Sequence, residues 1–265
     1  PVDSDCGAGW IVVKDTQTLQ AIGNHPKYPA SGNYCLKNDV TVNVVGTTEK
    51  PAITDPYLKK ELGDITEFVP LTPFAKEGKD YTGEFTGIFE GNNHYIDNLK
   101  IQNNTVITNV GLFSIIGEKG NVRNVHVQGR IDAGCTNPEI PTYAGMLAGI
   151  TKGTVYNVSA LGYSVNACYA GGMAGWNSGN IESENGTTIY YVTDTNVNAE
   201  LCAGGFVGKN TGHVRRSYVD GVSVKNTENK AAGFVCLNES GSVEKSFVYN
   251  GSVDAKNAGG FVSTA

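Results

Sequence analysis

The chain has 265 residues, a formal net charge of −6 and 34 glycines, roughly twice the usual glycine content. This length can bury a large core, and the acidic balance argues against nucleic-acid binding, for which a basic stripe is expected. No apolar stretch reaches the roughly 18 residues that a transmembrane helix needs, so the sequence predicts no membrane-spanning segment.

Residues 1–33 are predicted to form an N-terminal cap. Residues 10–13 have the composition of a strand, and Asp15 or Thr16 can cap a short helix that stops at Gly23. A helix in this place would cover the open end of the β structure predicted for residues 34–265.

Residues 47–81 form a long stretch with several prolines and charges, so we expect an excursion from the β structure with a short helix at 58–62. Functional residues concentrate in long excursions of this kind. Its carboxylates could serve a glycan-cleaving or metal site, or they could simply be solvated surface. They are Asp55, Glu61, Asp64 and Glu67.

A short glycine motif followed by apolar residues returns six times from residue 110 onward. Successive register glycines are separated by 34, 27, 33, 28 and 27 residues. A unit of about 27 or 28 residues, with insertions in the two longer steps around 135–141 and 182–187, is typical of a solenoid. The register glycines are Gly111, Gly145, Gly172, Gly205, Gly233 and Gly260.

Each unit holds three short runs of β-branched and aromatic residues, separated by Gly, Asn or Asp turns and without helical periodicity. Three strands repeated in register describe one rung of a right-handed parallel β-helix, in which equivalent strands pair about 4.8 Å apart. An antiparallel propeller blade needs about 40 to 50 residues, so the unit is too short for that fold. Inward positions should stack into apolar columns such as Val122, Val155, Val214 and Val243, and the glycines should lie at corners or close approaches.

The six cysteines include no Cys-x-x-Cys metal pair. Cys6 and Cys35 flank the N-terminal segment, and we predict a disulfide between them. The other four recur at steps of 33, 34 and 34 residues, close to the repeat. They could form disulfides between neighbouring rungs in an oxidising compartment or remain buried thiols, and their pairing is left open. They are Cys135, Cys168, Cys202 and Cys236.

Residues 85–101, Phe-Thr-Gly-Ile-Phe-Glu-Gly-Asn-Asn-His-Tyr-Ile-Asp-Asn-Leu-Lys-Ile, resemble the segment that precedes GLUG repeats in bacterial surface proteins. Residues 204–212 look like the GLUG motif itself, and residues 33–40 and 68–71 resemble the entry of such domains. The resemblance implies a β-helix of a secreted or wall-attached bacterial protein. Such proteins include adhesin-like proteins and the non-catalytic N-terminal regions of immunoglobulin A peptidases. Six cysteines depart from the pattern, because many such repeats contain few.

The usual catalytic motifs are absent from the sequence: it has no His-Glu-x-x-His, no phosphate-cradling loop and no Gly-x-Ser-x-Gly. We therefore predict no catalytic residue, metal site or cofactor. A binding surface is predicted instead at Trp176, Tyr169, Tyr190 and Tyr191, because aromatic faces suit sugar rings and protein partners. The alternative is that Tyr190 and Tyr191 alternate in and out of a strand, with one of them in the core.

The sequence thus predicts a non-catalytic extracellular binding module of an adhesin-like protein, with a host glycan or a host protein as its partner. A glycan-active β-helix enzyme, with its site in the 47–81 excursion or on the adjacent face, is one alternative, and a structural spacer is another. A new rung opens at 259–262, and solenoids need capping units, so we also expect the native polypeptide to continue beyond this fragment.

Overall fold

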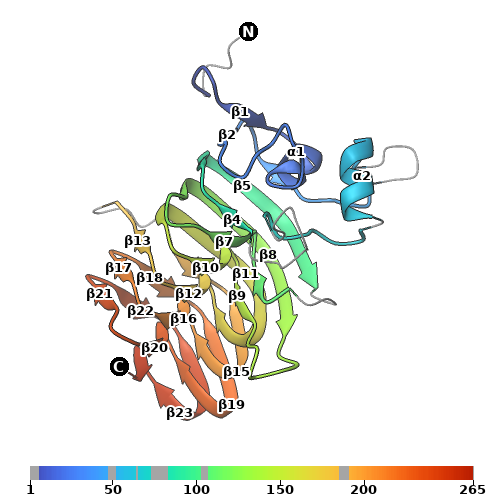
Figure 1. Cartoon of the computed structure of the whole chain (residues 1–265). Coiled ribbons are helices and arrows are strands. Elements are labelled where there is room, and N and C mark those ends of the chain that lie inside the picture. Colours follow the sequence, from blue (N-terminus) through green and yellow to red (C-terminus); the bar gives the residue numbers. More distant parts are fainter. Residues whose placement is uncertain are drawn as a thin grey trace.

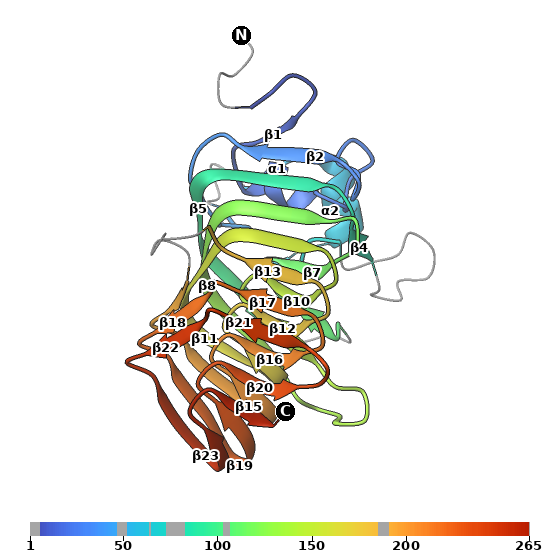
Figure 2. The ribbon, with the colours of Figure 1, turned by 90° about the vertical axis from the view of Figure 1, so that its left-hand side faces the viewer.

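The computed structural model describes residues 6–46, 52–63, 65–72, 83–102, 107–184 and 191–264. In this part the chain coils into a parallel β-solenoid, with two short helices at its N-terminal end (Figures 1 and 2). Strands of successive turns stack side by side and pair in parallel, in one sheet of 17 strands and another of seven. The predicted all-β parallel solenoid is confirmed.

The strands fall into these two sheets. The wide sheet contains β1 (Ile11–Val13), β2 (Asn33–Leu36), β3 (Val40–Thr41), β5 (Ile88–Gln102), β6 (Asn109–Val110), β8 (Asn121–Gly134), β9 (Tyr143–Gly145), β11 (Thr154–Gly171), β13 (Asn180–Glu182), β14 (Val192–Thr193), β15 (Asn196–Gly204), β17 (His213–Arg215), β18 (Tyr218–Asp220), β19 (Ser223–Ala232), β21 (Ser242–Glu244), β22 (Phe247–Tyr249) and β23 (Ser252–Gly259). The narrow sheet contains β4 (Glu84–Phe85), β7 (Phe113–Ile116), β10 (Ala148–Thr151), β12 (Ala174–Asn177), β16 (Val207–Asn210), β20 (Val235–Asn238) and β24 (Val262–Thr264).

The register of the narrow sheet reproduces the predicted repeat. Paired residues from β10 to β24 are 26, 33, 28 and 27 positions apart, and they are Ala148, Ala174, Val207, Val235 and Val262. The first of these steps is one residue shorter than the glycine motif suggests, because Gly145 pairs with Gly171 and not with Gly172.

Apolar columns fill the interior, as the sequence predicts. Val122 pairs with Val155, and Val214 pairs with Val243, while Ile181 bridges the two pairs. A second column consists of phenylalanine rings. Phe234 is fully buried between Phe206 and Phe261, and each pair of ring centroids lies 4.8 Å apart.

The glycine column exists because successive turns approach closely along it. A Cβ built on Gly205 would lie 2.0 Å from the carbonyl oxygen of Gly233, and a Cβ on Gly233 would lie 2.3 Å from that of Gly260. No side chain fits such a distance without moving the backbone of the next turn. The predicted role of these glycines is confirmed.

The helix of the N-terminal cap also forms where the sequence predicts it. α1 spans Thr16–Ala21, and the Asp15 side chain accepts a hydrogen bond from the Thr18 backbone N–H. The side-chain amide of Gln20 is fully buried. It donates a hydrogen bond to the Val69 carbonyl and accepts one from the Val69 N–H, as a neighbouring strand would. This pair ties the cap to the excursion.

The described part of the excursion contains a helix and then returns to the core. α2 spans Pro56–Leu62, which includes the predicted residues 58–62. The Phe68 N–H donates to the Lys100 carbonyl, and the Leu71 N–H donates to the Leu112 carbonyl. Phe68 and Leu71 are both buried, so this part of the excursion supplies core residues.

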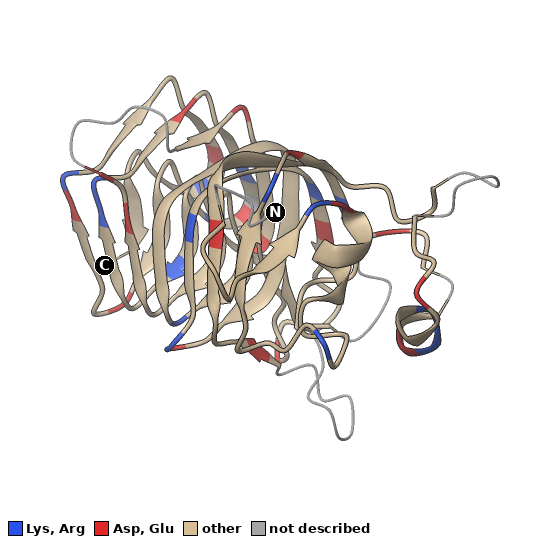
Figure 3. Cartoon of the chain, turned by 90° about the horizontal axis from the view of Figure 1, so that it is seen from above, with Lys and Arg blue, Asp and Glu red and all other residues tan. Residues whose placement is uncertain are grey.

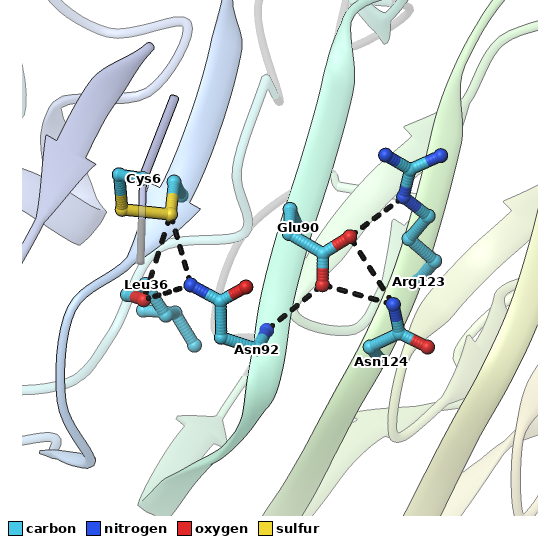
Figure 4. The surroundings of a disulfide bond; sticks show 7 residues. Cys6, Leu36, Glu90, Asn92, Arg123 and Asn124 are labelled. Carbon is cyan, nitrogen blue, oxygen red and sulfur yellow. Dashed lines mark hydrogen bonds and ion pairs between the residues drawn. A yellow bond between two sulfur atoms is a disulfide. The ribbon is translucent and has the colours of Figure 1, made fainter. Parts of the chain in front are cut away.

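Three disulfides join neighbouring turns. The predicted Cys6–Cys35 bond is present, and Asn92 Nδ2 lies 3.0 Å from Cys35 Sγ (Figure 4). The remaining cysteines, whose pairing the sequence left open, are bonded as Cys135–Cys168 and Cys202–Cys236, over separations of 33 and 34 residues. Neither helix in the described residues is long and apolar enough to cross a membrane.

Candidate functional site

Two of the four predicted aromatic residues belong to one surface cluster. Tyr169 on β11 stacks on Tyr143 of β9, with ring centroids 5.1 Å apart. Trp176 on β12 lies 5.5 Å from Tyr143, so Tyr143 bridges the two sheets. Tyr143 was not among the predicted residues, because the motif step of 27 residues places it beside Ala170, whereas the observed step of 26 pairs it with Tyr169.

A charged pair from the next two turns completes this cluster. Lys209 Nζ lies 5.2 Å from the Trp176 ring centroid and 2.9 Å from Glu239 Oε2. The hydrogen bond to Glu239 raises the pKa of Lys209, and burial raises the pKa of Tyr143. Trp176 Nε1 donates to Thr211 Oγ1 over 3.0 Å. The cluster is therefore fixed by its own contacts, and its rings are only partly free to meet a ligand.

Tyr191 lies in a different aromatic column, and Tyr190 lies outside the described residues. Tyr191, Tyr218 and Phe247 stack at centroid distances of 4.8 and 5.0 Å. Burial raises the pKa of Tyr218 to about 12, with a further contribution from Tyr191. The described residues of the predicted quartet therefore lie in two separate clusters and do not form one site, and one face of the Tyr191 ring is covered by Tyr218.

Charged residues recur at one register position along β5, β8, β13, β17 and β21. Residues of both charge signs are interspersed over the solenoid (Figure 3). Glu90 pairs in register with Arg123, and their side chains form an ion pair of 2.7 Å (Figure 4). Three turns further on, Glu182 forms ion pairs with Arg215 and Arg216. Arg123, Tyr156, Arg215 and Glu244 thus lie in one register column with Glu90 and Glu182.

One pair resembles the beginning of a nucleophilic site. His126 Nδ1 lies 2.9 Å from Ser159 Oγ, and Tyr95 stacks on the His126 ring at 4.5 Å. Ser159 is fully buried and His126 is 5% exposed, so a substrate cannot approach the Ser159 hydroxyl in this structure. Burial lowers the pKa of His126, which favours the neutral ring. The pair acts as a link between turns.

Among the described residues, the carboxylates of the excursion do not gather into a metal-binding cluster. Asp55 caps α2 by accepting hydrogen bonds from the Leu58 and Tyr57 N–H groups, and these bonds lower its pKa. Asp64 lies outside the described residues. Over the described parts of the chain, no three His, Cys, Asp or Glu side chains lie close enough together to hold a metal ion.

No family model matches the chain, and comparisons with curated proteins and with solved structures gave no significant match. The fold is therefore established by the structure alone. The likeness to GLUG repeats stays a hypothesis that rests on the motifs in the sequence.

Proposed function

We propose that this chain is a non-catalytic extracellular module that binds a partner, as in adhesin-like proteins of bacteria. The main support is the way its outward acids and bases are used. Glu182 is neutralised by two arginines, and Glu90 is held by Arg123 and Asn124. A general acid or base needs an accessible oxygen aimed at substrate, whereas these carboxylates have structural partners.

The solenoid also has the mechanical properties that a binding module needs. Its turns are joined by continuous parallel pairing and by three disulfides, so side chains on different turns keep fixed spacings. A rigid surface loses little conformational entropy when it binds a partner, which favours affinity. A structural spacer would share this rigidity, so binding itself must be measured.

The three disulfides support an extracellular location. Disulfides persist in oxidising environments such as the bacterial periplasm, the cell surface and the medium, and they are rare in the cytosol. The resemblance of residues 85–101 and 204–212 to GLUG repeats independently favours a bacterial surface protein.

The test is binding of the purified, oxidised chain to an array of glycans and host proteins, with product analysis for every glycan that is retained. Saturable binding without cleavage supports the proposal. Cleavage products would establish the enzyme alternative, and the absence of both binding and cleavage would favour a spacer. Trp176→Ala tests the aromatic cluster, and Tyr249→Ala is its control, since Tyr249 is 60% exposed and lies outside the cluster.

A further inference from the structure

A polar groove lies on the outer surface where the returning excursion meets β5, β8 and β11. Its volume is about 470 Å³, within the range of small-ligand sites. Its lining includes Glu67, Lys100, Arg130, Asp132 and Tyr163. The Phe68 N–H donates a hydrogen bond to the Lys100 carbonyl, which holds the excursion against β5.

A β-bulge brings Tyr163 to this groove. Gly162 pairs with Gly129, and Ser164 pairs with Arg130, so Tyr163 is an extra residue without a partner in β8. Bulges redirect side chains and are frequent next to binding sites. Tyr163 is 60% exposed, and no ring among the described residues stacks on it, unlike Tyr169 and Tyr191. Its ring therefore offers a free aromatic face.

The charges in the groove also differ from those on the rest of the solenoid. Lys100 and Arg130 are register partners on adjacent strands, so two cationic side chains start about 4.8 Å apart. Neither of them, nor Glu67, forms an ion pair with another described residue, whereas Glu90 and Glu182 do. These three groups are available to a ligand, and Asp132 already accepts a hydrogen bond from Asn166.

We propose that this groove binds a glycan through a sugar unit that carries a carboxylate, such as a uronic or sialic acid. Arg130 and Lys100 would bind the sugar carboxylate through charge-assisted hydrogen bonds. Glu67 and Asp132 would accept hydrogen bonds from hydroxyl groups, and Tyr163 would pack against the apolar face of the ring. The two carboxylates disfavour densely sulfated or phosphorylated ligands. The inference rests on the proposed binding function and gives it a ligand class and a location.

The test compares acidic oligosaccharides with the same oligosaccharides after reduction of the carboxylate to an alcohol, by calorimetry and ligand-observed NMR. Reduction should weaken binding to the wild-type chain at least about tenfold, because charged hydrogen bonds are lost. Arg130→Gln should weaken binding of the acidic form and leave the reduced form little affected. Tyr163→Ala should weaken both forms, while the control Tyr249→Ala, equally exposed, should change neither.

Thermal unfolding of each variant shows whether its fold is intact. If glycan binding is unchanged by both Arg130→Gln and Tyr163→Ala, the groove is not the binding site, but the proposed binding function still holds. Equal affinity for acidic and reduced glycans would overturn the ligand class. Binding to proteins alone would overturn the inference while supporting a binding module, and no binding at all would overturn both.

Discussion

Phe234 should be one of the most costly positions to truncate. Its ring is fully buried, and Phe206 and Phe261 cover its two faces at centroid distances of 4.8 Å. Truncating a buried phenylalanine to alanine lowers the free energy of unfolding by about 3 to 5 kcal/mol. Because Phe234→Ala also removes two ring stacks, we expect a loss of about 4 kcal/mol. Equilibrium urea unfolding of the oxidised protein, followed by circular dichroism, measures this loss as a lower midpoint.

Phe247 provides a matched control on the same solenoid. It also stacks on a ring one turn away, Tyr218 at 5.0 Å, but it is 54% exposed. Because Phe247 is only about half-buried and has one ring stack, we expect Phe247→Ala to lower the free energy of unfolding by about 1.5 kcal/mol. If Phe234→Ala does not fold, Phe234→Leu should still cost about 1 to 2 kcal/mol. Equal losses at Phe234 and Phe247 would refute the argument that burial between turns decides the cost.

Three further predictions concern the disulfides, the turns and pH. Replacing both Cys202 and Cys236 with alanine should cost about 3.7 kcal/mol in urea unfolding, because their bond closes a 34-residue loop; a loss under about 1 kcal/mol would contradict this. Lys245 has a φ of 51°, a left-handed conformation that asparagine tolerates better, so Lys245→Asn should stabilise by about 0.5 to 1 kcal/mol. Lys225→Asn, within strand β19, should give no gain in the same assay. Burial lowers the pKa of His126 in the folded chain below its ordinary 6.5. As the pH falls below about 6.5, the unfolded chain therefore binds a proton at His126 more readily than the folded chain does, and the free energy of unfolding decreases. The melting temperature should therefore fall more between pH 7.5 and 5.5 for the wild type than for His126→Gln, and equal falls would exclude this role for His126.

The core of this fold could be predicted because the spacing between turns imposes it on the sequence. Gly205 and Gly233 must be glycine where a Cβ would lie within 2.3 Å of a carbonyl oxygen in the next turn. Val122 and Val155 occupy equivalent inward positions of successive turns. Such constraints repeat in every turn, so they are visible in one sequence. The cap helix was predictable for a local reason, since Asp15 is an N-cap within its own segment.

The surface could not be predicted to the same degree, because its contacts depend on single-residue changes in register. Tyr143 pairs with Tyr169 because the step from Gly145 to its partner Gly171 is 26 residues, one fewer than the glycine motif suggests. Tyr163 reaches the groove through a single extra residue, and no repeated motif marks that bulge. The disulfide partners of Cys135 and Cys202 were likewise ambiguous, because all four later cysteines share nearly the same spacing.

The step after Gly145 shows how strongly the surface depends on register. With a step of 27, Ile150 would lie beside Asn177; with the observed step of 26, it pairs with Trp176, and Thr151 pairs with Asn177. A shift of one residue exchanges inward and outward side chains along a strand. A buried hydrogen bond favours the observed register, since Thr151 Oγ1 donates to Asn177 Oδ1 over 2.7 Å. In the other register Thr151 would no longer pair with Asn177, and leaving a buried polar group without its partner costs about 1 to 3 kcal/mol. This polar contact inside the solenoid distinguishes the two registers, and the apolar pattern alone does not.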